Sequence, residues 1–368
     1  MKVCILSTCT QRHMILVSTY QKYFKKNNIS YDFLYPDKFH EEELSDANAT
    51  YRFEVSSSNN PILKAFSFLG FVRYAKKIIR KNKYDLIIVW NEATAALFSR
   101  FLVKECSGRY IVVVLDLFNE KRKLLNEKAL TKKLNRAIDS SLLATVSSPG
   151  YTQYLSNNVQ YLFVDNINSA ILPEERTRQI DLSKPITILY SGNISYPELA
   201  IKMINRFKND ARFFIKIIGS GAEDLRNYVL KNGIKNVEIR GRFLSKDTLK
   251  ILDEGDIIYN VYDNKYHCEQ TALSNKLYYA ACLNVPILVS PETYMEKITH
   301  ELGIGFTIDF DDPQDICDSL FKWIVNFNPQ QSRERCKAFK ERAFKSHLDL
   351  YNKLDEIFMF ISEKSDSI

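Results

Sequence analysis

The sequence predicts an α/β protein with two domains, each built on a doubly wound parallel sheet covered by helices. Short runs rich in valine and isoleucine alternate with helical patterns along the chain, which is typical of strand–helix–strand units. The run at 86–89 is apolar throughout, as expected of a strand buried on both faces. A chain of 368 residues is also too long for a single core of ordinary size.

Twelve segments carry the strand pattern, six on each side of a break. The break is a polar, proline-containing stretch at 171–185, which is typical of a linker. We therefore expect an N-terminal domain at 1–170, a C-terminal domain at 186–335, and a helix at 336–368 that returns to the N-terminal domain. The expected strands are 2–6, 31–34, 84–90, 110–115, 142–146, 161–164, 186–190, 213–218, 237–240, 257–259, 286–289 and 306–308.

Charge and composition narrow the classes of function. The net charge is +7, and the first 180 residues carry 26 Lys and Arg against 17 Asp and Glu. A basic first half suits an acidic substrate or an anionic membrane surface. The sequence contains no nucleic-acid-binding motif, so we expect no nucleic-acid partner. Seven cysteines without a C-x-x-C pair indicate reduced thiols, and no apolar run is long enough for a bilayer, so we expect a cytoplasmic protein.

Glycines follow one predicted strand in the pattern Gly219-Ser220-Gly221. Glycine after a parallel strand lets the backbone approach a ligand, and a following helix offers free N–H groups to an anion. A tight turn explains the same pattern. The third glycine of a dinucleotide fingerprint is missing, which disfavours a Rossmann oxidoreductase.

Aspartates at 309, 311 and 312 resemble a D-x-D site for a divalent cation. They also suit a helix start, with Asp312 as N-cap and Pro313 at the first helical position. We favour the helix start and expect no metal.

The stretch from Asp256 to Ser290 carries the most specific pattern. Ser274-Asn275 should open a helix whose free N–H donors point beyond the ends of the strands. Lys276 in the first turn opposes the usual helix-dipole preference, so an anion such as a diphosphate is expected beside it. A solvated lysine is the alternative.

These patterns together resemble the donor domain of GT-B glycosyltransferases, and most of all glycosyltransferase family 4 enzymes of bacterial surface-polysaccharide synthesis. The order and spacing of the matching blocks are more specific than any single block. The first half of the chain matches only loosely, at 84–88 and 144–147. The matching blocks of the second half are 188–193, 215–221, 236–242, 272–278 and 303–313.

Three positions depart from the pattern of that family. The glutamate that usually follows the K-L-F/Y signature and holds the donor ribose is Tyr279 here, although Glu269 lies nearby in sequence. The basic residue that often follows the S-G loop is Asn193. The histidine that frequently contacts the donor sugar is Leu115, just before Asp116. Tyr279 could instead donate its hydroxyl to the ribose.

The resemblance implies a GT-B protein, with two Rossmann-like domains whose parallel sheets face a central cleft. It implies transfer of a hexose from a nucleotide-diphosphate sugar to a hydroxyl of a lipid-linked saccharide, with retention of configuration, in capsule or O-antigen synthesis. No metal or other cofactor is implied, since the nucleotide-sugar is a substrate. The implied donor-binding residues are Ser191, Gly192, Asn193, Gly219, Ser220, Gly221, Arg242, Phe243, Ser274, Asn275, Lys276, Leu277 and Tyr279.

Two residues of the first half are candidates for the catalytic machinery. Asp116 follows a predicted strand and is expected to face the donor sugar or the acceptor, with a local cap as the alternative. His13 follows the first strand and is a candidate acceptor contact, with a structural role as the alternative. Glu269 and His267, before the signature helix, are weaker candidates.

Residues 60–83 predict a helix with more apolar surface than one packing face can bury. We expect it to dock reversibly on anionic lipid, which would place the protein at the inner face of the cell membrane. Burial in a larger core or in a dimer contact are the alternatives. The surplus apolar side chains are Phe66, Phe68 and Phe71, and the basic row is Arg73, Lys76, Lys77 and Arg80.

Two further functions fit the same architecture. A non-catalytic subunit that binds saccharide or a partner enzyme is suggested by Tyr279 in place of the usual glutamate. A nucleotide-sugar epimerase would convert its donor without any acceptor.

Overall fold

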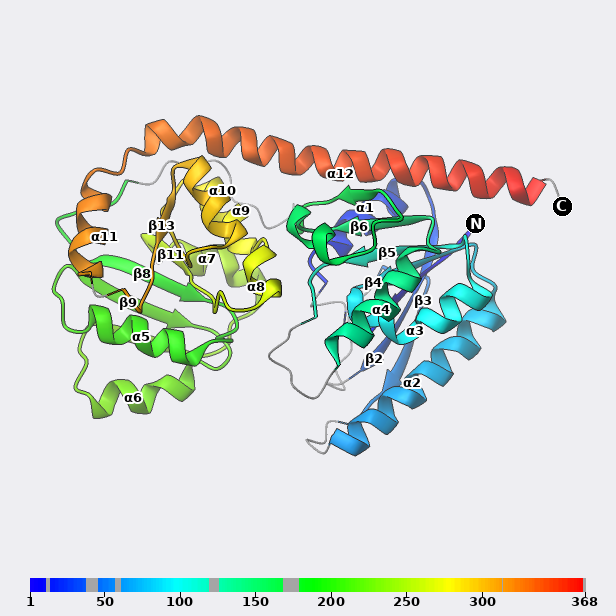
Figure 1. Cartoon of the computed structure of the whole chain (residues 1–368), viewed down its shortest axis with the longest axis horizontal. Helices are drawn as coiled ribbons and strands as arrows, with labels where there is room; N and C mark the ends of the chain where they lie inside the picture. Colours follow the sequence, from blue (N-terminus) through cyan, green and yellow to red (C-terminus); the bar gives the residue numbers. More distant parts are fainter. Residues whose placement is uncertain are drawn as a thin grey trace. The chain divides into compact units, whose positions relative to one another are not determined.

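The computed structural model describes residues 1–10, 14–37, 46–56, 61–118, 126–167, 179–312 and 314–366. The chain divides into two compact units (Figure 1). One contains Met1–Ser169 together with Ala343–Ile368, and the other contains Ala170–Arg342.

The N-terminal unit is built on a parallel sheet with strand order β3-β2-β1-β4-β5-β6-β7 among the described residues. Helices α1 and α12 pack on one face of this sheet, and α2 and α3 pack on the other (Figure 1). The strands are β1 (Lys2–Ser7), β2 (Ser30–Asp37), β3 (Ala49–Glu54), β4 (Leu86–Trp90), β5 (Tyr110–Val114), β6 (Leu143–Val146) and β7 (Tyr161–Phe163). The helices are α1 (Val17–Lys26), α2 (Pro61–Asn82), α3 (Glu92–Glu105), α4 (Glu127–Ile138) and, from Ala343 onward, α12 (Pro329–Asp366).

The C-terminal unit is built on a second parallel sheet, with strand order β10-β9-β8-β11-β12-β13 among the described residues. The strands are β8 (Ile186–Ser191), β9 (Phe213–Ile218), β10 (Val237–Arg240), β11 (Ile257–Asn260), β12 (Ile287–Val289) and β13 (Gly305–Thr307). The helices are α5 (Pro197–Phe207), α6 (Arg226–Lys231), α7 (Thr248–Leu252), α8 (His267–Thr271), α9 (Asn275–Leu283), α10 (Tyr294–Leu302) and α11 (Ile316–Val325).

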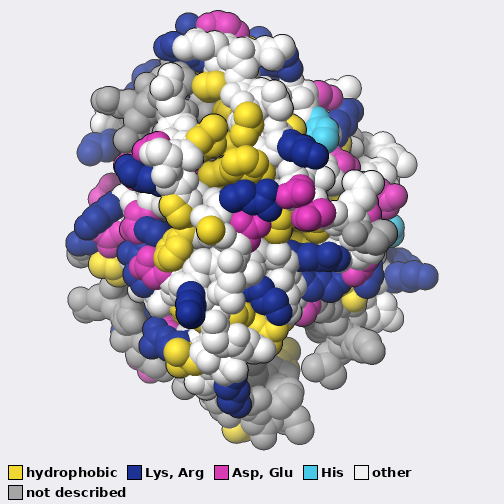
Figure 2. All heavy atoms as spheres, turned by 90° about the vertical axis from the view of Figure 1, so that its left-hand side faces the viewer, with side chains coloured by type: hydrophobic (Ala, Val, Ile, Leu, Met, Phe, Trp, Pro, Cys, Tyr) yellow, Lys and Arg dark blue, Asp and Glu magenta, His cyan; other side chains and the backbone are white. Residues whose placement is uncertain are grey.

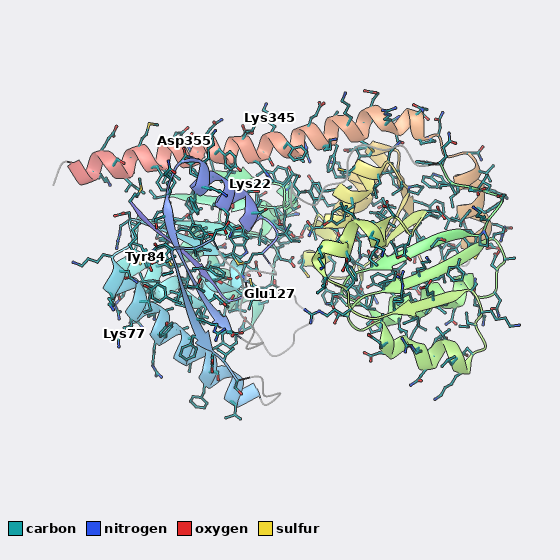
Figure 3. The ribbon with its side chains drawn as sticks, turned by 180° about the vertical axis from the view of Figure 1, so that it is seen from behind. Lys22, Lys77, Tyr84, Glu127, Lys345 and Asp355 are labelled. Carbon is teal, nitrogen blue, oxygen red and sulfur yellow. The ribbon has the colours of Figure 1, made fainter. Side chains whose placement is uncertain are left out.

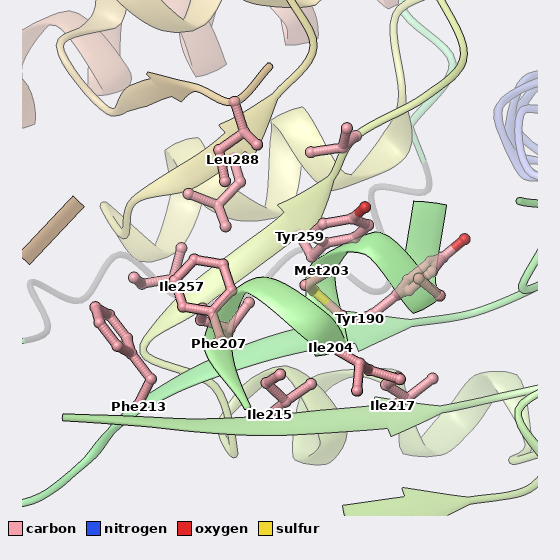
Figure 4. Packing of buried hydrophobic residues seen from close by; sticks show 14 of the residues in the cluster. Tyr190, Met203, Ile204, Phe207, Phe213, Ile215, Ile217, Ile257, Tyr259 and Leu288 are labelled. Atoms are coloured by element: carbon pink, nitrogen blue, oxygen red, sulfur yellow. The ribbon is translucent and has the colours of Figure 1, made fainter. Parts of the chain in front are cut away.

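The core of the C-terminal unit lies between its sheet and helices α5 and α11 (Figure 4). Alternate strand residues point into it, as the two-residue period of a strand requires. Ile215 and Ile217 of β9 meet Met203 and Phe207 of α5 there. Outside the core, the face shown in Figure 2 mixes basic and acidic side chains.

Each of the twelve predicted strands is present, within a few residues of its expected bounds. The sequence analysis missed β3, which pairs with β2 at the edge of the N-terminal sheet. Its residues alternate between half-buried and exposed, and it carries Arg52 and Glu54. Without a continuous apolar run, an edge strand resembles a loop in sequence.

The long helix α12 begins earlier than the predicted residue 336. Pro329 suits the first helical turn because its missing N–H leaves no donor unpaired there. The Asn328 side chain accepts a hydrogen bond from the Gln330 N–H, at 3.0 Å, and so caps the start of the helix. These two signals place the helix start at 329.

Helix α12 contributes packing to both units. Near its start, the Ser332 hydroxyl donates to the Asn284 side chain at 2.7 Å, within the C-terminal unit. Farther along, the Tyr23 hydroxyl of α1 donates to Asp355 at 2.5 Å, within the N-terminal unit (Figure 3). In the described part of the chain, no helix is both long and apolar enough to span a bilayer. All seven cysteines are free thiols.

Candidate functional site

Each sheet has one point at which the strand order reverses. In the C-terminal unit, β9 and β10 extend the sheet from β8 in one direction, and β12 and β13 extend it from β11 in the other. Ligands of open α/β sheets bind outside the carboxyl ends of the strands at such a point. The carboxyl ends of β8 and β11 are therefore the first place to look for a ligand site in this unit.

Two glycines bring the loops after β8 and β9 into direct contact. Gly192 and Gly219 both have positive φ angles, of 105° and 150°. A Cβ atom on Gly219 would lie 1.7 Å from the Gly192 carbonyl oxygen, so a larger residue does not fit. The Ile194 N–H donates to the Ser220 carbonyl at 2.9 Å and ties the loops together. Close packing of backbone on backbone thus explains Gly219, and the positive φ angle alone explains Gly192.

The helix expected after Gly221 is present, but it begins with a 3₁₀ turn. A single 3₁₀ turn, Glu223–Leu225, precedes the six-residue helix α6. The first turn carries two carboxylates, and a Cβ on Gly241 would lie 1.8 Å from Glu223 Oε1. These negative charges disfavour a phosphate directly at this turn. The donor-binding role of Gly219, Ser220 and Gly221 stays a prediction.

The helix start at Ser274 is confirmed. The Ser274 side chain accepts a hydrogen bond from the Lys276 N–H at 3.3 Å, as an N-cap should. The nine-residue helix α9 ends at Asn284, which is in the left-handed conformation. Lys276, in the first turn of α9, lies over the ring of Tyr190 near the carboxyl end of β8, so the free N–H groups of α9 lie at the edge where the strand order reverses.

Lys276 is a half-buried cation with an aromatic neighbour. Its Nζ lies 4.9 Å from the centre of the Tyr190 ring, which is buried at the carboxyl end of β8. The ammonium makes no ion pair with any residue that the structure describes. Burial lowers the pKa of Lys276 to about 8. A cation without a carboxylate partner beside a helix N-terminus is suited to an anionic ligand.

The lowered pKa of Lys276 predicts that binding of an anion beside it depends on pH. A bound diphosphate favours the protonated lysine and raises its pKa above 8, so the affinity is highest below pH 8. We expect the Kd for a nucleoside diphosphate to rise above pH 8, by up to about tenfold per pH unit. Calorimetric titrations at pH 7, 8 and 9 measure this slope. The Lys276→Ala variant controls for titration of the ligand, and an equal slope in that variant would contradict the assignment.

Asn260 is a polar residue at this edge that the sequence analysis did not select. It ends β11 and is 2% exposed. Its Oδ1 accepts a hydrogen bond from the Tyr262 hydroxyl at 2.8 Å, which fixes the orientation of the amide. Its Nδ2 has no partner among the described residues. An asparagine closing an apolar strand was the signal available in the sequence.

Glu269 does not stand in for the missing ribose-binding glutamate. It is buried and accepts hydrogen bonds from the Tyr196 hydroxyl and the Cys268 thiol, each at 2.5 Å. The bond from Tyr196, the N-cap of α5, holds α8 against the start of α5, whereas Cys268 lies in α8 beside Glu269. His267 is exposed and contacts the Gln270 side chain at 3.2 Å. The structure therefore gives Glu269 a structural role.

The remaining predicted donor-binding residues differ in burial. Leu277 is fully buried, so its side chain packs in the core and only its backbone is available to a ligand. Tyr279 is half-buried, and burial raises the pKa of its hydroxyl. Ser191 is buried, whereas Asn193 is exposed and donates to the Ser195 hydroxyl at 2.9 Å. Asn275 and Phe243 are half-buried, and Arg242 is exposed.

The aspartates after β13 are engaged locally. Asp311 pairs with Lys202 at 2.5 Å, and this contact lowers the pKa of the carboxyl. The prediction that Asp312 caps the next helix is wrong, because Asp315 accepts the capping bonds from the Cys317 and Asp318 N–H groups. Pro313 lies outside the described residues. In the described ranges, no group of three or more metal-type side chains is assembled.

The N-terminal sheet reverses its strand order between β1 and β4. Asn91 follows β4 with a φ of 69° and caps α3 by accepting from the Thr94 N–H at 2.8 Å. The Thr94 hydroxyl accepts from the Thr8 N–H at 2.9 Å, which joins the loop after β1 to α3. His13, the predicted acceptor contact, lies outside the described residues.

Asp116 lies beyond the carboxyl end of β5 and is exposed. Its Oδ1 accepts from the Leu117 N–H at 2.9 Å and from the Tyr151 hydroxyl at 3.5 Å. The first residue of α3, Glu92, is electrostatically coupled to Asp116. The sequence analysis missed Glu92, because a glutamate in the first turn of a helix is an ordinary stabilising residue.

Comparison with known proteins identifies the fold. No protein-family model and no curated protein matches the sequence. The sucrose-phosphate synthase of Thermosynechococcus elongatus is similar over 97% of this chain and 99% of its own, with a TM-score of 0.73 at 12% identity. An Anabaena protein, HepE, solved with UDP and glucose, matches over 100% of both chains, with a TM-score of 0.64 at 11% identity.

A third structure is WaaG, described as a glycosyltransferase involved in lipopolysaccharide biosynthesis. It covers 93% of this chain and 94% of its own, with a TM-score of 0.60 at 11% identity. These neighbours are GT-B glycosyltransferases. The chain therefore has the GT-B fold, with two Rossmann-like domains on parallel sheets.

Proposed function

We propose that the chain is a glycosyltransferase that binds a nucleotide-diphosphate sugar at the carboxyl ends of β8 and β11. The observation that carries this proposal is Lys276, a half-buried ammonium at the start of α9 that pairs with no described carboxylate. The glycosyltransferases that share its fold, and the UDP bound to HepE, support a nucleotide donor.

The chemistry of this site is stabilisation of a leaving group. In sugar transfer, the bond from the anomeric carbon to the diphosphate oxygen breaks, and its electron pair leaves on the diphosphate. The acceptor oxygen forms the new bond and gives up its proton to the departing diphosphate. The transition state is oxocarbenium-like, so offsetting the charge that grows on the diphosphate lowers the barrier. Lys276 and the free N–H groups of α9 are placed to do this.

The type of sugar transfer and the acceptor are proposed from the resemblance of the sequence motifs to those of glycosyltransferase family 4. We propose that the chain resembles glycosyltransferase family 4 closely enough to share its retaining, hexosyl-transferring chemistry. A lipid-linked saccharide of a surface-polysaccharide pathway is the proposed acceptor. The lipopolysaccharide role of WaaG is consistent with that class of pathway.

A thermal-shift panel tests nucleotide binding directly. UDP, GDP, ADP and CMP, each with its sugar derivatives, are added to the full-length protein. We expect one nucleoside diphosphate and its sugars to raise Tm, by the mass-action stabilisation of a ligand that binds only the folded state. No stabilisation by any of these ligands would contradict the proposal.

The same panel separates the alternatives. Tyr279 at the position of the usual glutamate favours a binding subunit, which would bind nucleotide without transferring or hydrolysing the sugar. An epimerase would convert the stabilising nucleotide-sugar into its isomer with no acceptor present. Product analysis by chromatography after incubation with the donor distinguishes these outcomes.

We expect sugar transfer to continue in the presence of EDTA. Lys276 and the N–H groups of α9 supply the positive charge that a divalent ion would otherwise supply. The measurement is the initial rate of donor turnover with EDTA and with added magnesium or manganese. Loss of activity on chelation, with rescue by either metal, would contradict this prediction.

Helix α2 carries the proposed membrane surface. Leu63, Phe66 and Leu69 are 51%, 67% and 48% exposed. On the same face, nearer the end of the helix, lie the exposed basic residues Arg73 and Lys77. Lys77 is labelled on α2 in Figure 3. The expectation that Phe71 is surplus is wrong, because Phe71 is buried against Phe98 at 5.9 Å between ring centres. Phe68 is half-buried.

We propose that this face of α2 docks reversibly on anionic lipid at the inner face of the cell membrane. Vesicle cosedimentation tests it with a Phe66→Ser, Lys77→Glu variant. Each basic residue near anionic lipid contributes about 1 kcal/mol, and the aromatic ring adds apolar burial, so we expect at least a tenfold loss of binding.

A matched control is available on α6. Leu230 is 71% exposed and precedes the exposed Lys231 in the C-terminal unit. The Leu230→Ser, Lys231→Glu variant should bind anionic vesicles like the wild type. Equal binding by the α2 variant, or no binding by the wild type at low salt, would contradict membrane docking.

A further inference from the structure

A groove in the N-terminal unit lies between α1 and the start of β2. Its volume is about 390 Å³, which is within the range typical of sites for small molecules. Lys25, in the last turn of α1, lines one side of the groove. Ser30 and Tyr31, the first two residues of β2, line another. The proposed nucleotide site does not account for this groove, because it belongs to the other unit.

Two amide side chains that line the groove are held in place by buried neighbours. The Gln21 amide nitrogen donates to the hydroxyl of the buried Tyr31 at 2.9 Å. The Asn48 amide nitrogen donates to Oδ1 of the buried Asp32 at 3.3 Å, and the Tyr84 hydroxyl donates to the other oxygen of that carboxylate at 2.6 Å (Figure 3). The amide oxygens of Gln21 and Asn48 accept no bond from a described residue, so they are fixed acceptors for a ligand.

The charges that line the groove cancel. Lys25 supplies one cation and Asp46 supplies one anion, and neither forms an ion pair with a described residue. The lining therefore offers no net attraction to an anion or to a cation. The other polar side chains are neutral and include Gln21, Ser30 and Asn48. This mixture favours a neutral ligand with several hydroxyl groups, because each hydroxyl both donates and accepts.

The groove is separate from the sheet edge that carries the catalytic candidate Asp116. That residue lies beyond the carboxyl end of β5, where open α/β sheets bind their ligands. The groove lies at the opposite end of the parallel sheet, because Ser30 is the first residue of β2. The eight residues of β2 span about 23 Å. A molecule in the groove is therefore too distant from the carboxyl edge to react there.

We propose that the groove is a second saccharide site, which binds a short neutral saccharide away from the edge where sugar transfer takes place. In it Asp46 and the amide oxygens of Gln21 and Asn48 accept from sugar hydroxyls, and Lys25 donates to them. Ile29 is half-buried and supplies an apolar contact for the C–H face of a sugar ring. Binding needs no nucleotide. Its biological meaning, to hold a saccharide substrate or product on the enzyme, rests on the proposed function.

Calorimetric titration of the full-length protein with maltose, cellobiose and lactose tests this site. We expect at least one of these disaccharides to bind. Lys25→Met and Asp46→Ala should each weaken binding at least about tenfold, because each removes a charge-assisted hydrogen bond. Both residues are exposed and form no ion pair with a described residue, so both variants should remain folded. Lys26→Met is the matched control, since Lys26 is the next exposed residue of α1 and does not line the groove.

Hydrogen–deuterium exchange locates the bound disaccharide. We expect slower exchange at 21–25 and at 46–48, and no change there with glycine, a zwitterion, or with inorganic phosphate. The proposal is overturned if no disaccharide binds, if both groove variants bind like the wild type, or if Lys26→Met loses as much affinity as they do. Protection of these segments by glycine or phosphate instead of a disaccharide also overturns it. Because none of these ligands is a nucleotide, the outcome is independent of the thermal-shift panel.

Discussion

Replacing Lys276 with alanine is expected to weaken binding of a nucleoside diphosphate by about 10- to 150-fold. A charge-assisted contact to phosphate contributes about 1.5–3 kcal/mol. The ammonium of Lys276 forms no ion pair with a described carboxylate, so it is available to the phosphate. The parent nucleoside lacks the diphosphate, so its affinity should change little. Calorimetric Kd values for both ligands, with wild type and variant, measure the difference.

Lys297→Ala is the matched control for this substitution. Lys297 also lies over a tyrosine ring, 5.8 Å from the centre of Tyr294, but it is exposed on α10. Its removal should leave both affinities unchanged. If Lys276→Ala weakens the nucleoside as much as the diphosphate while the variant remains folded, Lys276 does not contact phosphate.

Gly219→Ala is expected to destabilise the C-terminal unit by about 3–5 kcal/mol and to abolish nucleotide binding. The new Cβ would lie 1.7 Å from the Gly192 carbonyl oxygen, and a φ of 150° is unfavourable for alanine. The two loops must then separate at the edge where the nucleotide is proposed to bind. Urea denaturation followed by circular dichroism measures the loss.

The Gly233→Ala variant measures the loss of stability that comes from the backbone angle alone. Gly233 has a φ of 60°, and no atom lies within 4 Å of the position that an added methyl group would take. We expect a loss of only about 1 kcal/mol and unchanged nucleotide binding. A similar loss for both glycine variants would show that the contact between the β8 and β9 loops is not what fixes Gly219.

The sequence was sufficient for the regular part of the fold. Continuous apolar runs such as β4 and β5 are typical of strands buried on both faces, and their alternation with helices implies parallel sheets. The sequence analysis missed the edge strand β3 because half of its side chains face water. The sequence analysis assigned the N-cap of α11 to Asp312, whereas the structure has it at Asp315. Several aspartates close together in the sequence suit the same capping role.

Within the candidate site, the sequence pointed to a binding residue only where a side chain departs from the usual preference for its position in a helix. Lys276 at a helix N-terminus is such a residue, and the structure supplies its burial and its ring contact. Glu269 and Glu92 could not be distinguished in sequence. One is fully hydrogen-bonded in the interior, and the other has an unmatched oxygen, and both facts depend on residues distant in the chain.

Hydrogen–deuterium exchange tests the central claim most directly, because it locates the nucleotide on the whole chain. The ligand is the nucleoside diphosphate that raises Tm most. The proposed site predicts slower exchange in the loop at 191–193 and in the first turn of α9, at 275–277. Unchanged exchange in both segments would contradict it, as would protection confined to the groove between α1 and β2 that is lined by Gln21, Lys25 and Asn48.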